Sequence, residues 1–259
     1  MKIVILSELT PRDWIVVQEI LKSFTSVTLI HLTPTPGRKR KHQVKGFNSI
    51  GKKIFKKIYK IRLRSGVKPY LDKKLNYQKV EFPSGEINSG RGIAFLKELN
   101  PDILFTCWAP ILKEPVITIP KIAAINAHFG ISPDYRGNDT LFWALFKRDF
   151  EKVGGCLHYI SKGVDSGNIL VQVRPSLVKG DGILTLELKT AALLSRAAVQ
   201  IIETLHTSEI LPEGKIQSEK GRNYKSSEKT LAVELKYLVL KTIGFWKVKP
   251  SMERVDYFI

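Results

Sequence analysis

Three polar residues, Asn126, His128 and Asp165, carry side chains that together could catalyse acyl transfer to an amine. An amine that attacks an acyl carbonyl must lose a proton, and the carbonyl oxygen must carry negative charge in a tetrahedral intermediate. An Asn amide and an imidazole N–H can donate hydrogen bonds to that oxygen, and a carboxylate can collect or relay the proton of the amine. A simpler interpretation also stands, in which Asn126 caps a turn, His128 ends a strand and Asp165 occupies a turn.

The local sequence predicts that Asn126 and His128 end a buried strand. An apolar run over residues 123–125 leads into these two polar positions, and Gly, Pro and a segment without regular period follow. Side chains at i and i+2 of an extended segment point to one face. Because active sites of open α/β sheets lie beyond the carboxyl ends of strands, we expect Asp165 to meet both residues there in one pocket.

Three segments around these residues form a longer motif: Asn126-Ala-His128, Pro133-Asp-Tyr135-Arg136-Gly137 and Gly163-Val-Asp165-Ser-Gly167-Asn-Ile169. This motif resembles the formyltransferase family that uses 10-formyltetrahydrofolate. The resemblance implies an α/β fold of Rossmann-like type, with a mostly parallel sheet flanked by helices, and catalytic roles for Asn126, His128 and Asp165. The chain departs from the family pattern at Gly130, where many members have Ser and therefore a hydroxyl that could orient the loop or substrate.

The same resemblance implies that 10-formyltetrahydrofolate is the formyl donor. Ile111 and Leu112, in the loop after a strand predicted over residues 103–107, and Val164 are the implied contacts of the folate. The alternative for Ile111 and Leu112 is that they are ordinary core residues at the edge of the sheet. No metal site is expected, because the chain has five His, two Cys and no metal-binding spacing of these residues.

The resemblance leaves the acceptor amine open. A primary amine of an amino sugar on a nucleotide or polysaccharide precursor is the first expectation, and residues 217–224 are similar to a short segment that trails many sugar formyltransferases. Methionyl-tRNA is the second acceptor. A third alternative is a catalytically silent relative that binds through its basic helix. Neither the acceptor nor the oligomeric state, for which a homodimer is one option, follows from the sequence.

The first elements predict a strand, helix and strand that wind into a parallel sheet. The strands are expected over residues 2–6 and 27–32, and Thr10 is expected to cap a helix that begins at Pro11. Because no Gly-x-Gly-x-x-Gly follows the first strand, a nicotinamide or flavin oxidoreductase is not expected.

Further along, we expect a helix over residues 89–99 and a long helix, capped by Asp181, that ends near residue 206. These elements give a catalytic domain over residues 1–206, with a basic insertion at 38–68, and a short extension over 207–259 that holds one more helix, 228–242.

The segment over residues 38–64 contains twelve Lys or Arg and no Asp or Glu, in a chain of 259 residues with a net charge of +18. Apolar residues recur every three or four positions, which predicts a cationic amphipathic helix from Phe47 onward; they are Phe47, Ile50, Ile54, Ile58 and Ile61. Such a helix over residues 47–64 could bind an anionic membrane surface or the phosphates of RNA or of a nucleotide-linked substrate. It could also pack on the sheet with its basic face in solvent. Nucleic acid is the least favoured partner, because the segment has no glycine-aromatic RNA signature.

The composition predicts a globular cytosolic protein, with peripheral binding at the inner membrane face as the alternative that the basic helix suggests. The chain is 43% hydrophobic and 25% charged, and its longest apolar runs are far shorter than a membrane span. Cys107 and Cys156 both lie in apolar runs, so we expect them to be buried packing residues.

Overall fold

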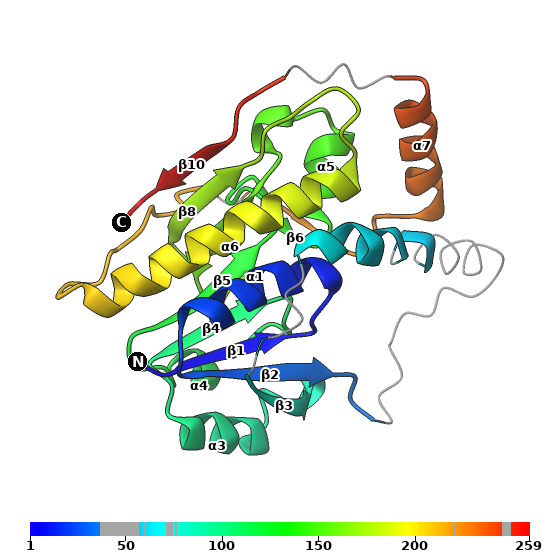
Figure 1. Ribbon diagram of the computed structural model, residues 1–259. Helices are drawn as coiled ribbons and strands as arrows, with labels where there is room; N and C mark the ends of the chain where they lie inside the picture. The colour runs from blue at the N-terminus through cyan, green and yellow to red at the C-terminus, as the bar shows by residue number, and fades with distance from the viewer. Residues whose placement is uncertain (37–56, 60, 71–74, 76, 220, 245–249) are drawn as a thin grey trace.

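The computed structural model describes residues 1–36, 57–59, 61–70, 75, 77–219, 221–244 and 250–259. An eight-stranded sheet in the order β10-β8-β7-β5-β4-β1-β2-β3 forms its centre (Figure 1). The strands are β1 (Ile3–Ser7), β2 (Val27–Thr33), β3 (Gln78–Pro83), β4 (Ile103–Cys107), β5 (Ala123–His128), β7 (Gly155–Tyr159), β8 (Ile169–Arg174) and β10 (Arg254–Tyr257). The pairs from β3 to β5 are parallel, and β7, β8 and β10 add antiparallel pairs at the other side. The predicted mostly parallel, Rossmann-like α/β fold is confirmed.

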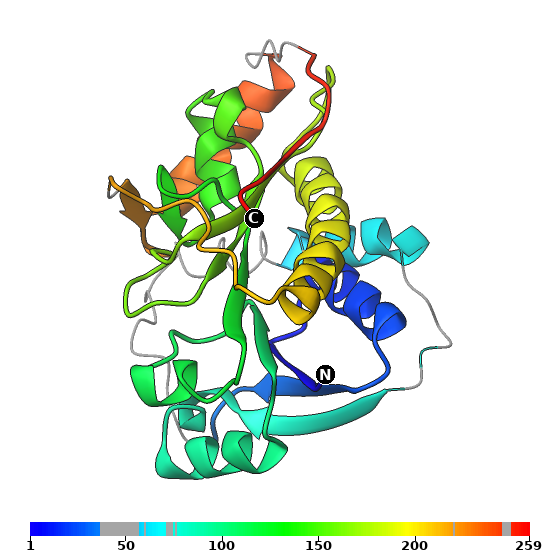
Figure 2. The same cartoon turned by 90° about the vertical axis from the view of Figure 1, so that its left-hand side faces the viewer.

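Helices cover both faces of the sheet, as the continuous apolar runs of its inner strands require. The long helix α6 (Ile183–Thr207) packs beside α1 (Pro11–Ser23) on one face, over Ile5, Phe105 and neighbouring apolar residues. The helix α3 (Gly90–Leu99) and the short helix α4 (Glu114–Ile117) cover the other face, over Leu6 and Leu104 (Figure 2). Cys107 and Cys156 are both buried and unpaired, as predicted.

Helix capping follows the sequence at Thr10 but not at Asp181, the two predicted caps. Thr10 is the N-cap of α1, and its backbone N–H donates to Asp13 Oδ2 at 3.1 Å. Ser89 caps α3 through a bond from Gly92 N–H to its hydroxyl oxygen at 3.3 Å. The predicted Asp181 cap of α6 is wrong, because Gly182 is the N-cap. The Asp181 carboxylate instead accepts from Val178 N–H at 2.9 Å and from Lys189 Nζ at 2.8 Å, which closes the preceding turn.

Residues after 206 take part in both sheets of the molecule. The strand β10 pairs with β8, and β9 (Arg222–Tyr224) pairs with β6 (Tyr135–Gly137) in a separate two-stranded sheet. The helix α7 (Leu231–Thr242) packs near α5 (Thr140–Phe146), and aromatic rings link α5 to the small sheet: Tyr224 stacks on Trp143 at 5.4 Å and on Tyr135 at 5.6 Å between ring centres. The sequence predicts α7 but not β10, whose four residues lie at the sheet edge, the first two exposed and the last two half-buried.

Only the end of the basic segment lies within the described residues, since Phe47, Ile50 and Ile54 fall outside them. Residues 57–59 and 61–67 are helical. Leu63 and Val67 are buried against the core, with Tyr59 beside them, whereas Ile58 and Ile61 are 46% and 56% exposed. The side of this helix that packs is therefore not the side that carries Ile58 and Ile61. Within the described ranges, no helix is long and apolar enough to cross a lipid bilayer.

Candidate active site

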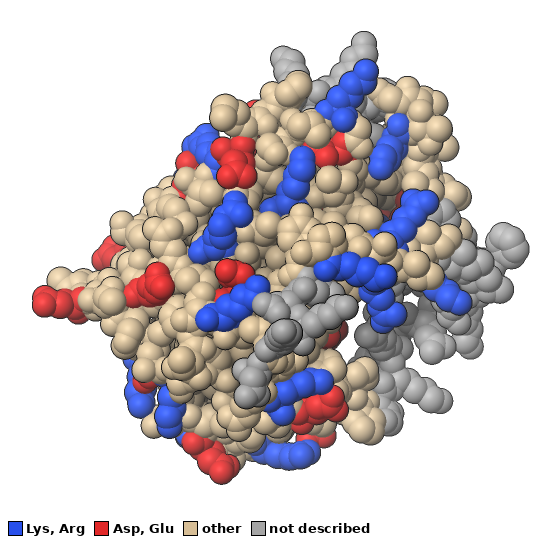
Figure 3. Space-filling view, in the orientation of Figure 1, with Lys and Arg blue, Asp and Glu red and all other residues tan. Residues whose placement is uncertain are grey.

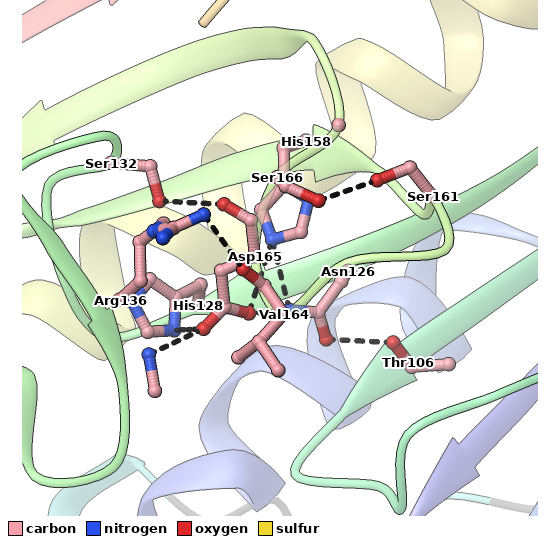
Figure 4. A network of polar contacts seen from close by, with 12 residues as sticks. Thr106, Asn126, His128, Ser132, Arg136, His158, Ser161, Val164, Asp165 and Ser166 are labelled. Carbon is pink, nitrogen blue, oxygen red and sulfur yellow. Dashed lines mark hydrogen bonds and ion pairs between the residues drawn. The ribbon is translucent and has the colours of Figure 1, made fainter. Parts of the chain in front are cut away.

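The structure brings Asn126, His128 and Asp165 together at the carboxyl end of β5 (Figure 4). Asn126 Nδ2 donates to Asp165 Oδ1 at 3.4 Å, and His128 Nδ1 lies 3.4 Å from Asp165 Oδ2. The two β5 side chains share a face because they are two residues apart on an extended strand. Asp165 reaches them from the loop that joins β7 to β8.

Thr106 fixes the orientation of the Asn126 amide. The two residues are register partners on the parallel strands β4 and β5, so their side chains leave the sheet on one face. The Thr106 hydroxyl donates to Asn126 Oδ1 at 2.7 Å. Because this bond holds the amide oxygen, the NH₂ group must point the other way, toward Asp165. Sequence reasoning missed Thr106, although its place near the end of a predicted buried strand was a signal.

His158 is a second histidine of the site that sequence reasoning missed as a functional residue. It is the register partner of Asn126 on the antiparallel strand β7, and its Nε2 lies 3.1 Å from Asn126 Nδ2 and 3.5 Å from Asp165 Oδ1. Its Nδ1–H donates to the Tyr159 carbonyl at 2.8 Å, so in the neutral ring Nε2 accepts from Asn126. A buried histidine inside an apolar strand was the signal, since His158 is 3% exposed.

The two ring nitrogens of His128 have different partners. Nε2–H donates to the Tyr135 carbonyl at 2.9 Å, and the Thr140 hydroxyl lies 3.4 Å from the same nitrogen. A carbonyl only accepts, so Nε2 carries the hydrogen and Nδ1 of the neutral ring keeps a lone pair that faces Asp165. Burial lowers the pKa of His128, and the nearby Asp165 carboxylate offsets part of that effect. The neutral ring therefore offers a proton acceptor, while its N–H is bonded to the backbone rather than free for a substrate oxygen.

Asp165 is held in its ionised form. Burial alone would raise the pKa of this carboxyl, but the attraction of the protonated form of His128, together with His158 and the Gly137 N–H, holds it well below its usual range. The Gly137 N–H donates to Oδ2 at 2.7 Å. An ionised carboxylate beside a neutral imidazole can stabilise the imidazolium that forms when the ring accepts a proton.

A cavity of about 340 Å³ opens beside these residues. Asn126, His128 and Asp165 line it, and so do Ile111 and Val164, two of the three implied folate contacts. Leu112 is placed elsewhere: it is 4% exposed and buried among the core residues under α4, which is the alternative stated above for this residue. Ile111, by contrast, is 65% exposed. The remaining wall includes residues from after position 206, namely Asn223, Tyr224, Lys225 and Ser226.

A buried ion pair forms another part of the cavity wall. Arg12 Nη1 lies 2.8 Å from Glu187 Oε1, and both residues line the cavity. The guanidinium also lies 4.3 Å from the ring centre of Phe129 and 5.1 Å from that of Trp108. These contacts hold Arg12 in place, so it presents a fixed charged wall rather than a mobile side chain.

The departure from the family pattern at Gly130 has a steric cause in this chain. A Cβ atom at position 130 would lie 2.5 Å from Thr140 Oγ1 and 2.6 Å from His128 Nε2. Both distances are shorter than van der Waals contact, so no larger residue fits while Thr140 keeps its place. Thr140 itself is fixed, because its hydroxyl donates to the Phe129 carbonyl at 2.6 Å. The hydroxyl next to His128 therefore comes from the first residue of α5.

Comparisons with known proteins identify the family of the chain. The family model for formyl transferase matches residues 1–202. A methionyl-tRNA formyltransferase from Kosmotoga olearia is 32% identical over 130 residues, which cover 50% of this chain and 42% of that protein. The match thus spans less than half of the length of this relative.

Two solved structures share the fold. A sugar N-formyltransferase from Shewanella sp FDAARGOS_354 superposes with a TM-score of 0.57 at 15% identity and covers 88% of this chain and 78% of that one. The formyltransferase PseJ from Anoxybacillus kamchatkensis, in complex with UDP-4,6-dideoxy-4-formamido-L-AltNAc and tetrahydrofolate, has a TM-score of 0.52 at 20% identity, with coverage of 93% and 91%. At these identities the likeness concerns the fold. Because the family model matches most of the chain, and the predicted motif lies within the match, the chain belongs to the formyl transferase family.

Proposed function

We propose that this chain transfers a formyl group from 10-formyltetrahydrofolate to a primary amine of an amino sugar carried by a nucleotide or a polysaccharide precursor. The observation that carries the proposal is the contact of Asn126, His128 and Asp165 at the wall of one cavity. An amide donor, a neutral imidazole and an ionised carboxylate are the groups that acyl transfer to an amine needs.

Asn126 is the proposed donor to the carbonyl oxygen as negative charge develops on it. Its amide is already oriented by Thr106, so little reorganisation is needed when the charge appears. The amide donates to His158 Nε2 at 3.1 Å and to Asp165 Oδ1 at 3.4 Å, so the substrate oxygen takes the place of Asp165 Oδ1 at the longer of these two bonds. Thr106 and His158 act on the reaction through Asn126 and are positioning residues.

His128 is the proposed proton acceptor, with Asp165 as its stabilising partner. Bound 10-formyltetrahydrofolate supplies the formyl carbon, to which the amine nitrogen bonds while the bond from that carbon to N10 breaks. His128 Nδ1 takes the proton that the amine loses, and Asp165 stabilises the resulting imidazolium. His128 then donates this proton to the leaving N10 nitrogen, so the imidazole ring is neutral again at the end of the reaction.

The lining of the cavity contains residues that suit a folate and residues that suit a polar acceptor. Apolar surface where a ring system can lie comes from Trp108, Ala109, Ile111 and Val164. Hydrogen-bond donors and acceptors come from Asn138, Asp139, Asn223, Lys225 and Ser226. Such a wall suits an acceptor rich in hydroxyl and phosphate groups, and the neighbours with known structures include sugar N-formyltransferases, one of them solved with a UDP-sugar and tetrahydrofolate.

Methionyl-tRNA is the second candidate acceptor. The curated relative with 32% identity over half of this chain carries that activity in its name, and the net charge of +18 suits a nucleic acid. A catalytically silent relative is the candidate from another class. The ionised Asp165 beside a neutral His128 argues against it, because a binding module has no need of such a pair.

One assay separates these candidates. Purified protein is incubated with 10-formyltetrahydrofolate and a panel of nucleotide-linked amino sugars, with charged initiator tRNA in parallel, and free tetrahydrofolate is followed. We expect release with one class of amino sugar and none with the His128→Ala variant. Release with tRNA alone would favour the second candidate, release without any amine would indicate hydrolysis, and binding of the folate without release would favour the silent relative.

A further inference from the structure

The loop that carries Asp165 does not belong to a helix or strand. Asp165 has a backbone φ of +45°, which is the left-handed region, where residues with a side chain are uncommon. The direction of its carboxylate toward His128 depends on this backbone conformation. Something outside the loop must hold it, because such conformations persist only when the surroundings determine them.

Gln217 supplies this support from the C-terminal extension. Its Nε2 donates one hydrogen bond to the Asp165 carbonyl at 3.1 Å and a second to the Gly167 carbonyl at 2.6 Å. Both amide hydrogens are thereby used on the backbone of one loop. The other donor to the Asp165 carbonyl, the Ser132 hydroxyl, is longer, at 3.4 Å.

Gln217 is itself placed by the sheet. Two residues earlier, Lys215 exchanges backbone hydrogen bonds with Ile169, the first residue of β8, at 2.8 and 2.9 Å. A second link follows at Gly221, whose carbonyl accepts from Arg136 Nη2 at 3.1 Å, while Arg136 Nη1 donates to the Val164 carbonyl at 3.5 Å. Lys215, Gln217 and Gly221 therefore hold the loop at both of its ends, and they lie beyond residue 202, where the family-model match ends.

We propose that Gln217 is a positioning residue for Asp165 and so sets the proton affinity of His128. The expected effect of Gln217 on turnover rests on the function proposed above, whereas its expected effect on the pKa of His128 does not. The two bonds fix the Asp165 backbone, the backbone fixes the carboxylate, and the carboxylate raises the pKa of the facing imidazole against the effect of burial. Removing both bonds frees the loop and lets the carboxylate move away.

The test compares Gln217→Met, which keeps the length of the side chain and removes both donors, with Gln200→Met, the same change at an exposed position of α6. The first readout needs no substrate: the pKa of His128 is measured by NMR titration of the imidazole, assigned with the His128→Ala variant. We expect this pKa to fall in Gln217→Met and to stay at the wild-type value in Gln200→Met. If Gln217→Met folds and the pKa of His128 is unchanged, the proposal is overturned. This outcome does not depend on which acceptor the enzyme uses.

The second readout is kinetic. We expect kcat of Gln217→Met to fall about tenfold or more, with KM for folate and amine within about twofold, because the groups that transfer the proton must stay within hydrogen-bond reach. If the measured activity falls only in proportion to the fraction of folded protein, kcat per folded molecule and the pH profile stay unchanged. That result would show a purely structural role for Gln217 and overturn the proposal. Gln217→Asn, which keeps the amide but shortens its reach, serves as the milder variant where Gln217→Met does not fold. If the wild type turns over no acceptor, the proposed function fails while the NMR test remains decisive for Gln217.

Discussion

The opposed surroundings of His128 decide what this residue can do. One ring nitrogen donates to the Tyr135 carbonyl, and the other faces an ionised carboxylate. Burial favours the neutral ring, and Asp165 favours the charged ring. The ring is thus neutral before reaction and stabilised once it has accepted a proton, which is the behaviour required of a general base near neutral pH.

The first prediction concerns the pH dependence of this pair. Activity requires neutral His128, so kcat should fall as the pH drops through the pKa of His128, which burial places below the ordinary value of about 6.5. In Asp165→Asn the carboxylate no longer raises that pKa. The acid limb of kcat should therefore move to lower pH, and the plateau should fall by roughly a hundredfold. Rate profiles between pH 4.5 and 9 check both effects, and an acid limb that moves to higher pH would contradict this account.

The second prediction concerns the amide donor. Asn126→Ala should lower kcat by roughly a hundredfold or more, the scale of a lost oxyanion donor, with folate affinity largely kept. Thr106→Val keeps the shape of the side chain and removes the hydroxyl that orients the amide, so its loss should be smaller and in kcat as well. Steady-state kinetics and a folate binding titration on each variant separate the two effects. Equal losses of folate affinity with unchanged kcat would make Asn126 a folate contact instead.

At the scale of elements, the end of β5 and the start of α5 are fitted to one another. Gly130 leaves room for the Thr140 hydroxyl, and Thr140 lies against His128 and the Phe129 carbonyl. Neither residue can change alone without affecting the ring of His128. The two positions therefore form one unit, although nine residues, which include the small strand β6, separate them.

The third prediction tests this coupling with a double-mutant cycle. Gly130→Ser alone should lower both stability and kcat, because its Cβ would lie within 2.6 Å of Thr140 and His128 atoms. Thr140→Ala removes the hydroxyl that occupies the space. The double variant should recover only the part of the loss that Thr140 Oγ1 causes, because a Cβ at position 130 would still lie 2.6 Å from His128 Nε2 and 2.7 Å from the Cβ that Thr140→Ala keeps. Thermal unfolding and kcat of all four proteins give the coupling, and additive losses would show that the two residues act independently.

At the scale of the whole molecule, basic and exposed apolar residues occur together at one end. In the described part of the basic segment, Ile58 and Ile61 are exposed beside Lys57, Arg62 and Arg64, and no acidic residue is present between positions 57 and 70. The nearby helix α7 exposes a further stripe, Leu235, Leu238, Val239 and Ile243. Lys229, just before α7, lies 6.0 Å from the Tyr59 ring centre and connects the two regions. Figure 3 shows several Lys and Arg side chains on this side of the molecule, among residues of other types.

The fourth prediction is that this end binds anionic lipid surfaces. Each basic residue near such a surface adds about 1 kcal/mol, an attraction that salt screens. We expect the protein to sediment with anionic but not with neutral vesicles at low salt. Arg62→Gln with Arg64→Gln should weaken binding by roughly thirtyfold, which corresponds to about 2 kcal/mol.

The matched control removes two exposed charges from the opposite face of the sheet, with Lys97→Gln and Lys113→Gln. Equal weakening in the control and the test variant would indicate a general effect of net charge rather than a binding surface. If the wild-type protein does not sediment with anionic vesicles at low salt, the helix that ends the basic segment is a packed helix with a solvated face.

The sequence by itself determined the core elements and the chemistry of the site. Local rules of burial and backbone hydrogen bonding govern the apolar runs 103–107 and 123–125 and the helix starts at Thr10 and Ser89. The strands β4 and β5 and the helices α1 and α3 could therefore be predicted without the fold. The motif around Asn126, His128 and Asp165 indicated the family through its resemblance to the formyltransferase pattern, and the family-model match confirms that family.

Tertiary structure alone decided which groups surround these residues. Thr106 and His158 reach Asn126 through strand register, and Gln217 reaches Asp165 across 52 residues of chain. Leu112 and Asp181 show the reverse. The family resemblance implied a folate contact for Leu112, and the local sequence favoured a helix cap at Asp181, but packing placed Leu112 in the core and Asp181 in a turn. Such contacts depend on which strands become neighbours and how they align, and no local pattern of side chains encodes that alignment.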